Sequence, residues 1–556
     1  MKDPEANDDP IAVSIDLLRS LSSEIPHVQT FKGKWALINT KLTNLKAHLA
    51  DFADFPTSAS NPLALDLLLS VAHTLRAAVD LARRCRDSSL IEGKLRTQSD
   101  VDSILAKLDL HLRDGEIIFK SGVLHDTAGF SSSSKRESVR AECRNLVTCL
   151  QIGGGESRYA AVEALLALLR EDDKNVTIAV AQGIVPVLVK LLDSGSFEMK
   201  ENAVAAIAVV SVVESSRSVL AAEGLLLLNH LVRVLDSGSG VAKEKACVAL
   251  EALSFSKENA RAICSSGGVS SLLDICEGGT PGSQASAAGV LRNLAAFAEN
   301  KENFIEEKGV GVLLGLASSG TALAQENAIG CLCHLVSDSE KRKDLVVKEG
   351  GIECLKNLNL WDSEFSNNNR GLEAAVELVM HLASCSMIAD ALVAEGFVTR
   401  IVKVMNCGVL GVRSQAAKAV YELGFCSRTR KEMGECGCIP PLVKMLDGKA
   451  VEEKEAAAKA LSALLRCAEN RKIFRRIDGA ILSTVQLLNP SMKNLDKKYP
   501  VAALAALAHS KKCKKQMVKA GACIHLQKLL DLEVEGSQKL LESLCRSKIW
   551  GVFARS

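Results

Sequence analysis

The chain has 556 residues, a size beyond which a single hydrophobic core stops growing, so several domains or a repeat architecture must account for it. Hydrophobic residues make up 47% of the sequence but aromatic residues only 4%, a composition that suits closely stacked helices. Lys and Arg number 68 against 66 Asp and Glu, so no global field attracts nucleic acid or anionic lipid. These values predict an all-α protein and argue against nucleic acid as a partner.

The 18 cysteines are scattered singly and form no CxxC pair. We expect them to be reduced and to serve as small buried hydrophobes, which predicts a reducing compartment, the cytoplasm or the nucleus. The acidic N-terminal sequence does not resemble a secretion signal, and the sequence shows no acylation or prenylation motif. The longest apolar run, residues 203–213, is shorter than the roughly 20 residues of a membrane span. We therefore expect no stable membrane insertion.

The first region, residues 1–122, is predicted to be a four-helix domain. Helices are expected within residues 11–21, 28–54, 65–79 and 101–112, and Ser99 is expected to cap the last of them. The second segment shows the clearest pattern, because its apolar residues follow one another in steps of four and three, as on the buried face of a packed helix. These residues are Phe31, Trp35, Ile38, Leu42, Leu45, Leu49 and Phe52.

Residues 123–140 are predicted to form a linker. Four serines precede a basic pair in this segment, a composition typical of a flexible spacer. An alternative interpretation is a phosphorylation site that changes how the flanking domains associate.

Residues 141–556 contain a phrase that recurs every 41 to 45 residues. A glycine opens each copy, an amphipathic helix follows, and an Ala-rich helix and a charged stretch complete it. Nine copies begin at Gly183, Gly224, Gly268, Gly309, Gly351, Gly396, Gly437, Gly479 and Gly521. A degenerate copy at residues 156–175 brings the total to about ten repeats.

The motifs of these copies resemble the armadillo-repeat family. The run IVPVLVKLL follows Gly183, AAAKALSALL begins at Ala456, and Asn470 and Arg471 stand in the connector that follows. The resemblance implies a right-handed superhelical solenoid without enzymatic activity. It also implies that the third helix of each unit lines a concave groove in which partner proteins bind.

The first region adds a second resemblance, carried by residues 85–109, CRDSSLIEGKLRTQSDVDSILAKLD. This region is similar to the helical domain that precedes the U-box and the repeats in plant U-box/armadillo ubiquitin ligases. The 18 residues of the linker are too few for a U-box, because a domain needs about 50. The chain therefore resembles relatives that lack the ligase activity.

No motif for catalysis or cofactor binding is found. The sequence contains no P-loop, no GxSxG, no HExxH and no EF-hand pattern. Cys331, Cys333 and His334 are expected on one helix, where residues two apart point to different sides, which argues against a shared metal ion. We expect no cofactor, no metal and no small-molecule substrate.

Alignment of the Ala-rich helices predicts where a partner would bind. Polar residues recur at one position in four consecutive units, and charged or aromatic residues often precede them. An Asn side chain there can hydrogen-bond an extended backbone. The alternative is a row of ordinary solvated helix residues. The predicted groove residues are Glu251, Arg292, Asn293, His334, His381, Tyr421 and Glu422.

The predicted function is that of a scaffold or adaptor that binds other proteins, as extended segments or helices, in this groove. Two alternatives are a component of a ubiquitin pathway that recruits substrates, and a peripheral membrane or trafficking adaptor. Two insertions, residues 361–370 and 488–500, are expected to be exposed polar loops at which partner specificity could arise.

Overall fold

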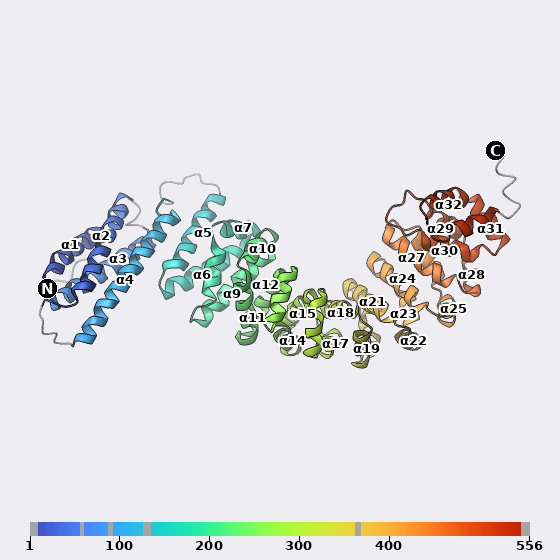
Figure 1. Ribbon diagram of the computed structural model, residues 1–556, viewed down its shortest axis with the longest axis horizontal. Coiled ribbons are helices and arrows are strands. Elements are labelled where there is room, and N and C mark those ends of the chain that lie inside the picture. Colours follow the sequence, from blue (N-terminus) through green and yellow to red (C-terminus); the bar gives the residue numbers. More distant parts are fainter. Residues whose placement is uncertain (1–8, 56–60, 87–92, 126–134, 362–367, 546–556) are drawn as a thin grey trace. The chain divides into compact units, whose positions relative to one another are not determined.

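The computed structural model describes residues 9–55, 61–86, 93–125, 135–361 and 368–545, and every regular element in these ranges is a helix (Figure 1). The predicted all-α class is thereby confirmed. The chain divides into two compact units, Met1–Leu227 and Leu228–Ser556, which are described separately below.

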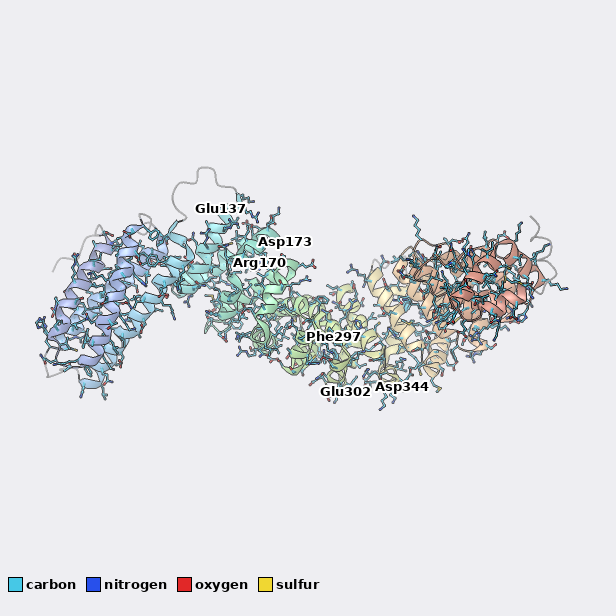
Figure 2. The ribbon with its side chains drawn as sticks, turned by 45° about the horizontal axis from the view of Figure 1, so that its top comes forward. Glu137, Arg170, Asp173, Phe297, Glu302 and Asp344 are labelled. Carbon is cyan, nitrogen blue, oxygen red and sulfur yellow. The ribbon has the colours of Figure 1, made fainter. Side chains whose placement is uncertain are left out.

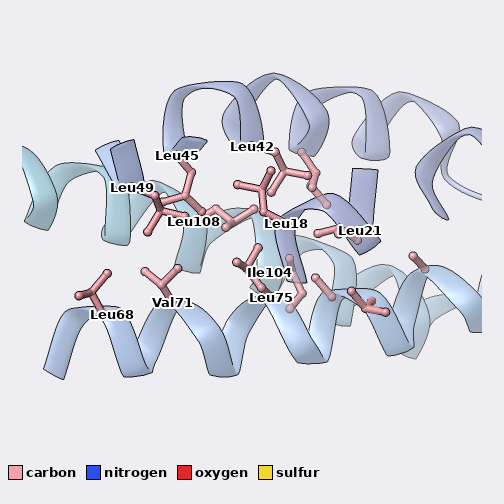
Figure 3. Packing of buried hydrophobic residues seen from close by; sticks show 14 of the residues in the cluster. Leu18, Leu21, Leu42, Leu45, Leu49, Leu68, Val71, Leu75, Ile104 and Leu108 are labelled. Carbon is pink, nitrogen blue, oxygen red and sulfur yellow. The ribbon is translucent and has the colours of Figure 1, made fainter. Parts of the chain in front are cut away.

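The first unit begins with a bundle of four helices, α1 (Pro10–Glu24), α2 (Lys32–Asp54), α3 (Pro62–Arg84) and α4 (Lys94–Ser121). Helix α1 packs on α2 and α3, and α4 packs on the same two helices. The stripe predicted on α2 is buried from Trp35 to Phe52 and meets leucines of the other three helices (Figure 3). The expected cap at Ser99 is wrong, because Gly93, with a φ of 88°, turns the chain into α4 six residues earlier.

Helix α3 is long and apolar enough, by length and composition, to cross a membrane. Half of its most apolar window is buried within the protein, where Leu68, Val71 and Leu75 belong to the core of the bundle. Two helix pairs pass the same test only when joined, and they are bent by 89° and 101°. The sequence analysis counted only uninterrupted apolar runs and therefore missed α3, whose charged residues lie between its apolar ones.

The predicted linker is only partly covered by the structure. Residues 123–125 form a short 3₁₀ helix, η2 (Val123–His125), and the serines at positions 131–134 lie outside the described residues. Helix α5 (Lys135–Ile152) begins within the segment predicted as linker and packs on α4 and on α6 (Gly155–Glu171).

The remaining 27 helices, α7 to α33, form nine successive triplets in the described chain. The first helices are α7 (Asp173–Ala181), α10 (Glu214–Ala222), α13 (Lys257–Ser265), α16 (Lys301–Glu306), α19 (Glu340–Lys348), α22 (Ser386–Ala394), α25 (Ser427–Glu435), α28 (Ala468–Phe474) and α31 (Lys511–Lys519). The second helices are α8 (Ile184–Leu191), α11 (Gly224–Ser237), α14 (Gly268–Gly278), α17 (Gly309–Ser319), α20 (Gly351–Asn357), α23 (Phe397–Val404), α26 (Ile439–Leu446), α29 (Ala480–Gln486) and α32 (Ala522–Asp531). The third helices are α9 (Phe197–Val212), α12 (Gly240–Leu253), α15 (Pro281–Ala295), α18 (Ala322–Val336), α21 (Asn369–Ala383), α24 (Leu410–Leu423), α27 (Val451–Leu464), α30 (Lys498–Leu507) and α33 (Ser537–Cys545).

The glycines between first and second helices have two separate roles. Gly183 and Gly479 adopt φ values of 80° and 79°, a left-handed conformation that costs glycine little. In three units the left-handed residue precedes the glycine that the repeat pattern marks. One of these is Gly268, where a β-carbon would lie only 2.7 Å from Cγ2 of Ile263. Glycine is required there for close packing of the two helices.

The charged stretches that the sequence suggested as connectors are the first helices. The recurring Asn lies in these helices or directly before them. It donates from Nδ2 to a main-chain carbonyl in the last turn of the preceding helix (α6, α12, α15 or α27), and that carbonyl has no partner within its own helix. Asn175, Asn259, Asn300 and Asn470 bond in this way to Leu168, Leu253, Leu294 and Leu464, at 2.9 to 3.2 Å.

The second insertion is less exposed than predicted, and the first is described only at its two ends. In the first, a short 3₁₀ helix, η4 (Asn359–Trp361), buries Trp361, whose Nε1 donates to the carbonyl of Leu355 at 2.6 Å. Residues 362–367 lie outside the described part. In the second, Leu488 and Leu495 are buried, and Lys497 donates to two main-chain carbonyls. Buried apolar residues in these segments pack against the solenoid, and the polar composition of the segments did not predict this packing.

Candidate partner-binding face

In the second unit, each third helix packs directly on the next. Figure 1 shows α15, α18 and α21 following one another in this way, with α14, α17 and α19 below them in the view. Alanines line these contacts and are completely buried, as at Ala287 and Ala328, and their small size lets the helices approach closely. We call the half-buried and exposed side chains of α12, α15, α18, α21, α24, α27 and α30 the third-helix face.

All seven predicted groove residues are half-buried and belong to this face. Two of them lean over a glycine of the following helix. A β-carbon at Gly289 would meet the carboxylate of Glu251, and one at Gly330 would lie 2.8 Å from Nε of Arg292. The glycines thus leave the space in which these charged side chains lie.

Arg292 contacts the next unit through its guanidinium group. Its Nη1 lies 3.4 Å from Oδ1 of Asn327 and 3.7 Å from the carboxylate of Glu326, while 42% of its side chain is exposed. Burial raises the pKa of Glu251, and the charge of Arg292 opposes that shift. Arg292 therefore joins three units and still presents its charge to solvent.

The side chain of Asn293 makes hydrogen bonds to the preceding unit. Its Nδ2 donates to the carbonyl of Glu251 at 3.2 Å and to Oγ of Ser254 at 2.9 Å. Both amide hydrogens are therefore used within the protein, where they tie α15 to the end of α12. The sequence pattern identified a polar position without showing that its donors are occupied.

The two histidines form an electrostatic group around Glu377, a residue that the sequence analysis did not select. Nε2 of His381 lies 3.7 Å from the carboxylate of Glu377, and the interaction with His381 lowers the pKa of Glu377. Burial, followed by the charge of Arg292, lowers the pKa of His334. At neutral pH His334 is accordingly an uncharged group that can donate and accept hydrogen bonds.

Tyr421 and Glu422 lie in a second group, in which the ammonium of Lys459 is central. Its Nζ lies 4.2 Å from the centroid of the Tyr421 ring, 5.9 Å from that of Tyr499 and 3.7 Å from the carboxylate of Glu422. The two tyrosine rings meet edge to face at 6.4 Å. The negative faces of aromatic rings attract a cation, so the two rings and the carboxylate of Glu422 together hold the ammonium of Lys459 in this group.

Glu377, Lys418 and Lys459 are the functional candidates that the sequence analysis missed. They occupy one equivalent position, three residues before Met380, Tyr421 and Ser462. A second alignment one helical turn earlier would have found them, because positions three residues apart share a helix face. Tyr499 carried no such signal, since it falls in the segment predicted to be a loop.

The cysteines near His334 lie inside the protein. Cys331 and Cys333 are buried, and burial raises the pKa of both thiols well above the ordinary value. Within the described residues, no three His, Cys, Asp or Glu side chains converge as metal ligands would.

Comparison with known proteins agrees with this architecture. Residues 172–211 match the armadillo/beta-catenin-like repeat family, and residues 12–123 match a domain of unknown function, DUF7032. The crystal structure of an engineered protein is 26% identical, with a TM-score of 0.63 over 72% of this chain and 98% of that one. A designed armadillo-repeat protein is 22% identical, with a TM-score of 0.38, over 43% of this chain and 98% of its own. No curated protein sequence matches.

These findings define the class of protein. The chain is an all-α helical repeat solenoid that follows a helical domain and matches the armadillo repeat at residues 172–211, and this class suggests a protein-binding scaffold. The plant origin and the relationship to U-box proteins stay predictions.

Proposed function

We propose that the chain is a non-enzymatic adaptor that holds an extended segment of a partner protein along the third-helix face of the second unit. The observation that carries this proposal is the row of half-buried polar side chains from Glu251 to Glu422, which five consecutive third helices contribute. A half-buried side chain is held in place by its neighbours, and its exposed part can still contact a ligand.

The spacing of the row suits an extended peptide. Packed helices lie roughly 8 to 10 Å apart, and an extended chain advances about 3.3 Å per residue, so each unit would meet about every third residue of the partner. The charges alternate along the row, since the carboxylate of Glu251 is followed by the guanidinium of Arg292 and later by Glu377 and Lys418. A partner with complementary charges at this interval would bind in one register.

The proposal includes a reducing compartment, the cytoplasm or the nucleus. None of the 18 cysteines forms a disulfide among the residues that the structure describes, and most are buried. Burial raises the pKa of thiols such as Cys264 and Cys276 to about 12, which keeps them protonated and unreactive at neutral pH.

The test compares two triple variants by affinity purification with cross-linking and mass spectrometry. The first, Arg292→Ala with His381→Ala and Glu422→Ala, alters half-buried residues of the third-helix face. The matched control makes three alanine substitutions at exposed charged residues of first helices. These are Arg261→Ala, Glu302→Ala and Asp344→Ala, and Figure 2 shows the last two at the outer edge of α16 and α19.

Both variants should retain wild-type helicity by circular dichroism. We expect the first variant to lose specific partners that the wild type and the control retain, and the remaining cross-links to shift away from α15 and α24. Identical partner sets for all three proteins, or an equal loss in the control, would show that this face is not the binding site.

A further inference from the structure

A hollow of about 530 Å³ lies at the C-terminal end of the third-helix face. Helices α24, α27 and α30 supply most of its lining. The rest comes from the residues just after α24 and α27, from Arg430 of α25 and from the turn before α33. It contains two residues of the predicted groove, Tyr421 and Glu422, together with Tyr499 and the partly exposed ring of Phe425. The sequence analysis did not anticipate a pocket here.

Two arginines in the lining are not neutralised. Arg430 is half-buried, and its Nε is shielded from solvent without a hydrogen-bond acceptor. Arg466 is exposed, and among the described residues no carboxylate forms an ion pair with either guanidinium. A guanidinium that makes no hydrogen bond within the protein can donate to a ligand, so the site favours a ligand that supplies acceptors.

The lysines near the pocket, in contrast, lie close to carboxylates. Lys459 lies 3.7 Å from Glu422, and Nζ of Lys498 lies 2.7 Å from the carboxylate of Asp496. Glu535, the remaining acidic residue of the lining, is exposed to solvent. Arg430 and Arg466 together with Glu535 therefore leave the lining with a net positive charge.

We infer that this pocket binds an acidic side chain of an extended partner peptide, with the carboxylate at Arg430 and Arg466. A guanidinium presents paired N–H donors whose spacing matches the two oxygens of a carboxylate. The rings of Tyr421 and Tyr499 provide an apolar wall for the neighbouring part of the peptide. The volume exceeds that of a single carboxylate and accommodates its flanking residues.

The inference deepens the proposed function and rests on it, because a peptide in this pocket would continue along the same face. The two can fail separately. Arg430 and Arg466 are absent from the triple variant above, and of its three residues only Glu422 belongs to the pocket lining.

The test measures fluorescence anisotropy of a labelled peptide in which glutamate alternates with threonine, titrated with the full chain. Its counterpart has glutamine in place of every glutamate. Each peptide is titrated with the wild type and with Arg430→Gln, Arg466→Gln and Arg476→Gln. Arg476 is an exposed residue just after α28 and lies outside the pocket lining, so its substitution changes the net charge equally and serves as the matched control.

We expect the acidic peptide to bind the wild type at least roughly tenfold more tightly than the glutamine peptide, because charge-assisted hydrogen bonds are the stronger kind. Arg430→Gln and Arg466→Gln should each remove most of this preference, and Arg476→Gln should leave it intact. Arg466 is exposed, so its variant should fold even if loss of the half-buried Arg430 disturbs packing.

Three results would overturn the inference. The first is equal binding of the acidic and glutamine peptides. The second is an equal loss of the preference in the Arg476→Gln control. In the third, inorganic phosphate protects the region around Arg430 in hydrogen exchange while the acidic peptide does not bind, which would make the pocket a site for small anions.

Discussion

His111 in the N-terminal bundle provides a pH-dependent test of the structure. The side chain lies on α4, is 6% exposed, and its Nε2 is 2.9 Å from Oγ1 of Thr74 on α3. Burial, with a smaller effect of Lys107, lowers the pKa of His111 from 6.5 to about 4. Acidification must therefore place a charge in the bundle or open it.

The sign and size of the effect follow from the two pKa values. Because the folded-state pKa lies below the unfolded value, the unfolded chain binds more protons between pH 6.5 and about 4, and stability falls as the pH falls through this window. A difference of about 2.5 units at 1.36 kcal/mol each limits the loss to about 3 kcal/mol. Asp114 acts in the opposite direction, because burial raises its pKa, with Arg113 and Arg158 opposing that shift.

The variant His111→Gln separates these contributions, because glutamine can hydrogen-bond Thr74 and does not titrate. Hydrogen exchange of α3 and α4 peptides, corrected for intrinsic exchange rates, measures the local free energy of opening in a chain of this length. From pH 7.5 to 4.5 we expect the wild type to lose about 2.5 kcal/mol relative to the variant. Parallel curves for the two proteins would refute the assignment of a buried neutral histidine.

Three further predictions concern the solenoid. Asn470→Ala should lower the free energy of unfolding, measured in a denaturation experiment, by about 2 kcal/mol, because a buried side chain that donates to two carbonyls is lost. The control Asn406→Ala removes an exposed hydrogen bond within one helical turn and should change this free energy by less than about 0.5 kcal/mol. Gly330→Ala should raise the melting temperature slightly, since alanine is more favourable than glycine in a helix interior by up to about 1 kcal/mol. The added β-carbon should also displace the side chain of Arg292. Undiminished capture of partners that require Arg292 would contradict this displacement. Cys436, an exposed thiol, should react with iodoacetamide before any buried thiol, as peptide mapping would show.

The sequence alone was sufficient for the helical repeat, because its signal is local and recurs. A glycine at intervals of 41 to 45 residues, an apolar periodicity of three and four, and an Ala-rich helix each describe a short segment. The stripe from Trp35 to Phe52 was predicted for the same reason. The charged connectors were not recognised as helices, because their stability comes from packing and from asparagine bonds to another helix.

The row of polar residues on the third helices could be predicted, but the role of each member could not. Asn293 and Arg292 are neighbours in sequence and belong to the same predicted set. Only the packing shows that the amide of Asn293 is used between α12 and α15, whereas the guanidinium of Arg292 still reaches solvent. Hydrogen-bond partners more than 30 residues away leave no trace in a local pattern.

The pocket at the end of the row was decided by tertiary structure alone. The sequence determined that Tyr421 and Glu422 occupy repeat positions, but Tyr499 and Arg430 follow no repeat rule and come from α30 and α25. Folding brings them together because the segment before α30 is anchored by Leu488, Leu495 and Lys497. The repeated sequence pattern determines where the helices form. Residues outside that pattern determine where charged and aromatic groups meet, because their positions depend on contacts between distant parts of the chain.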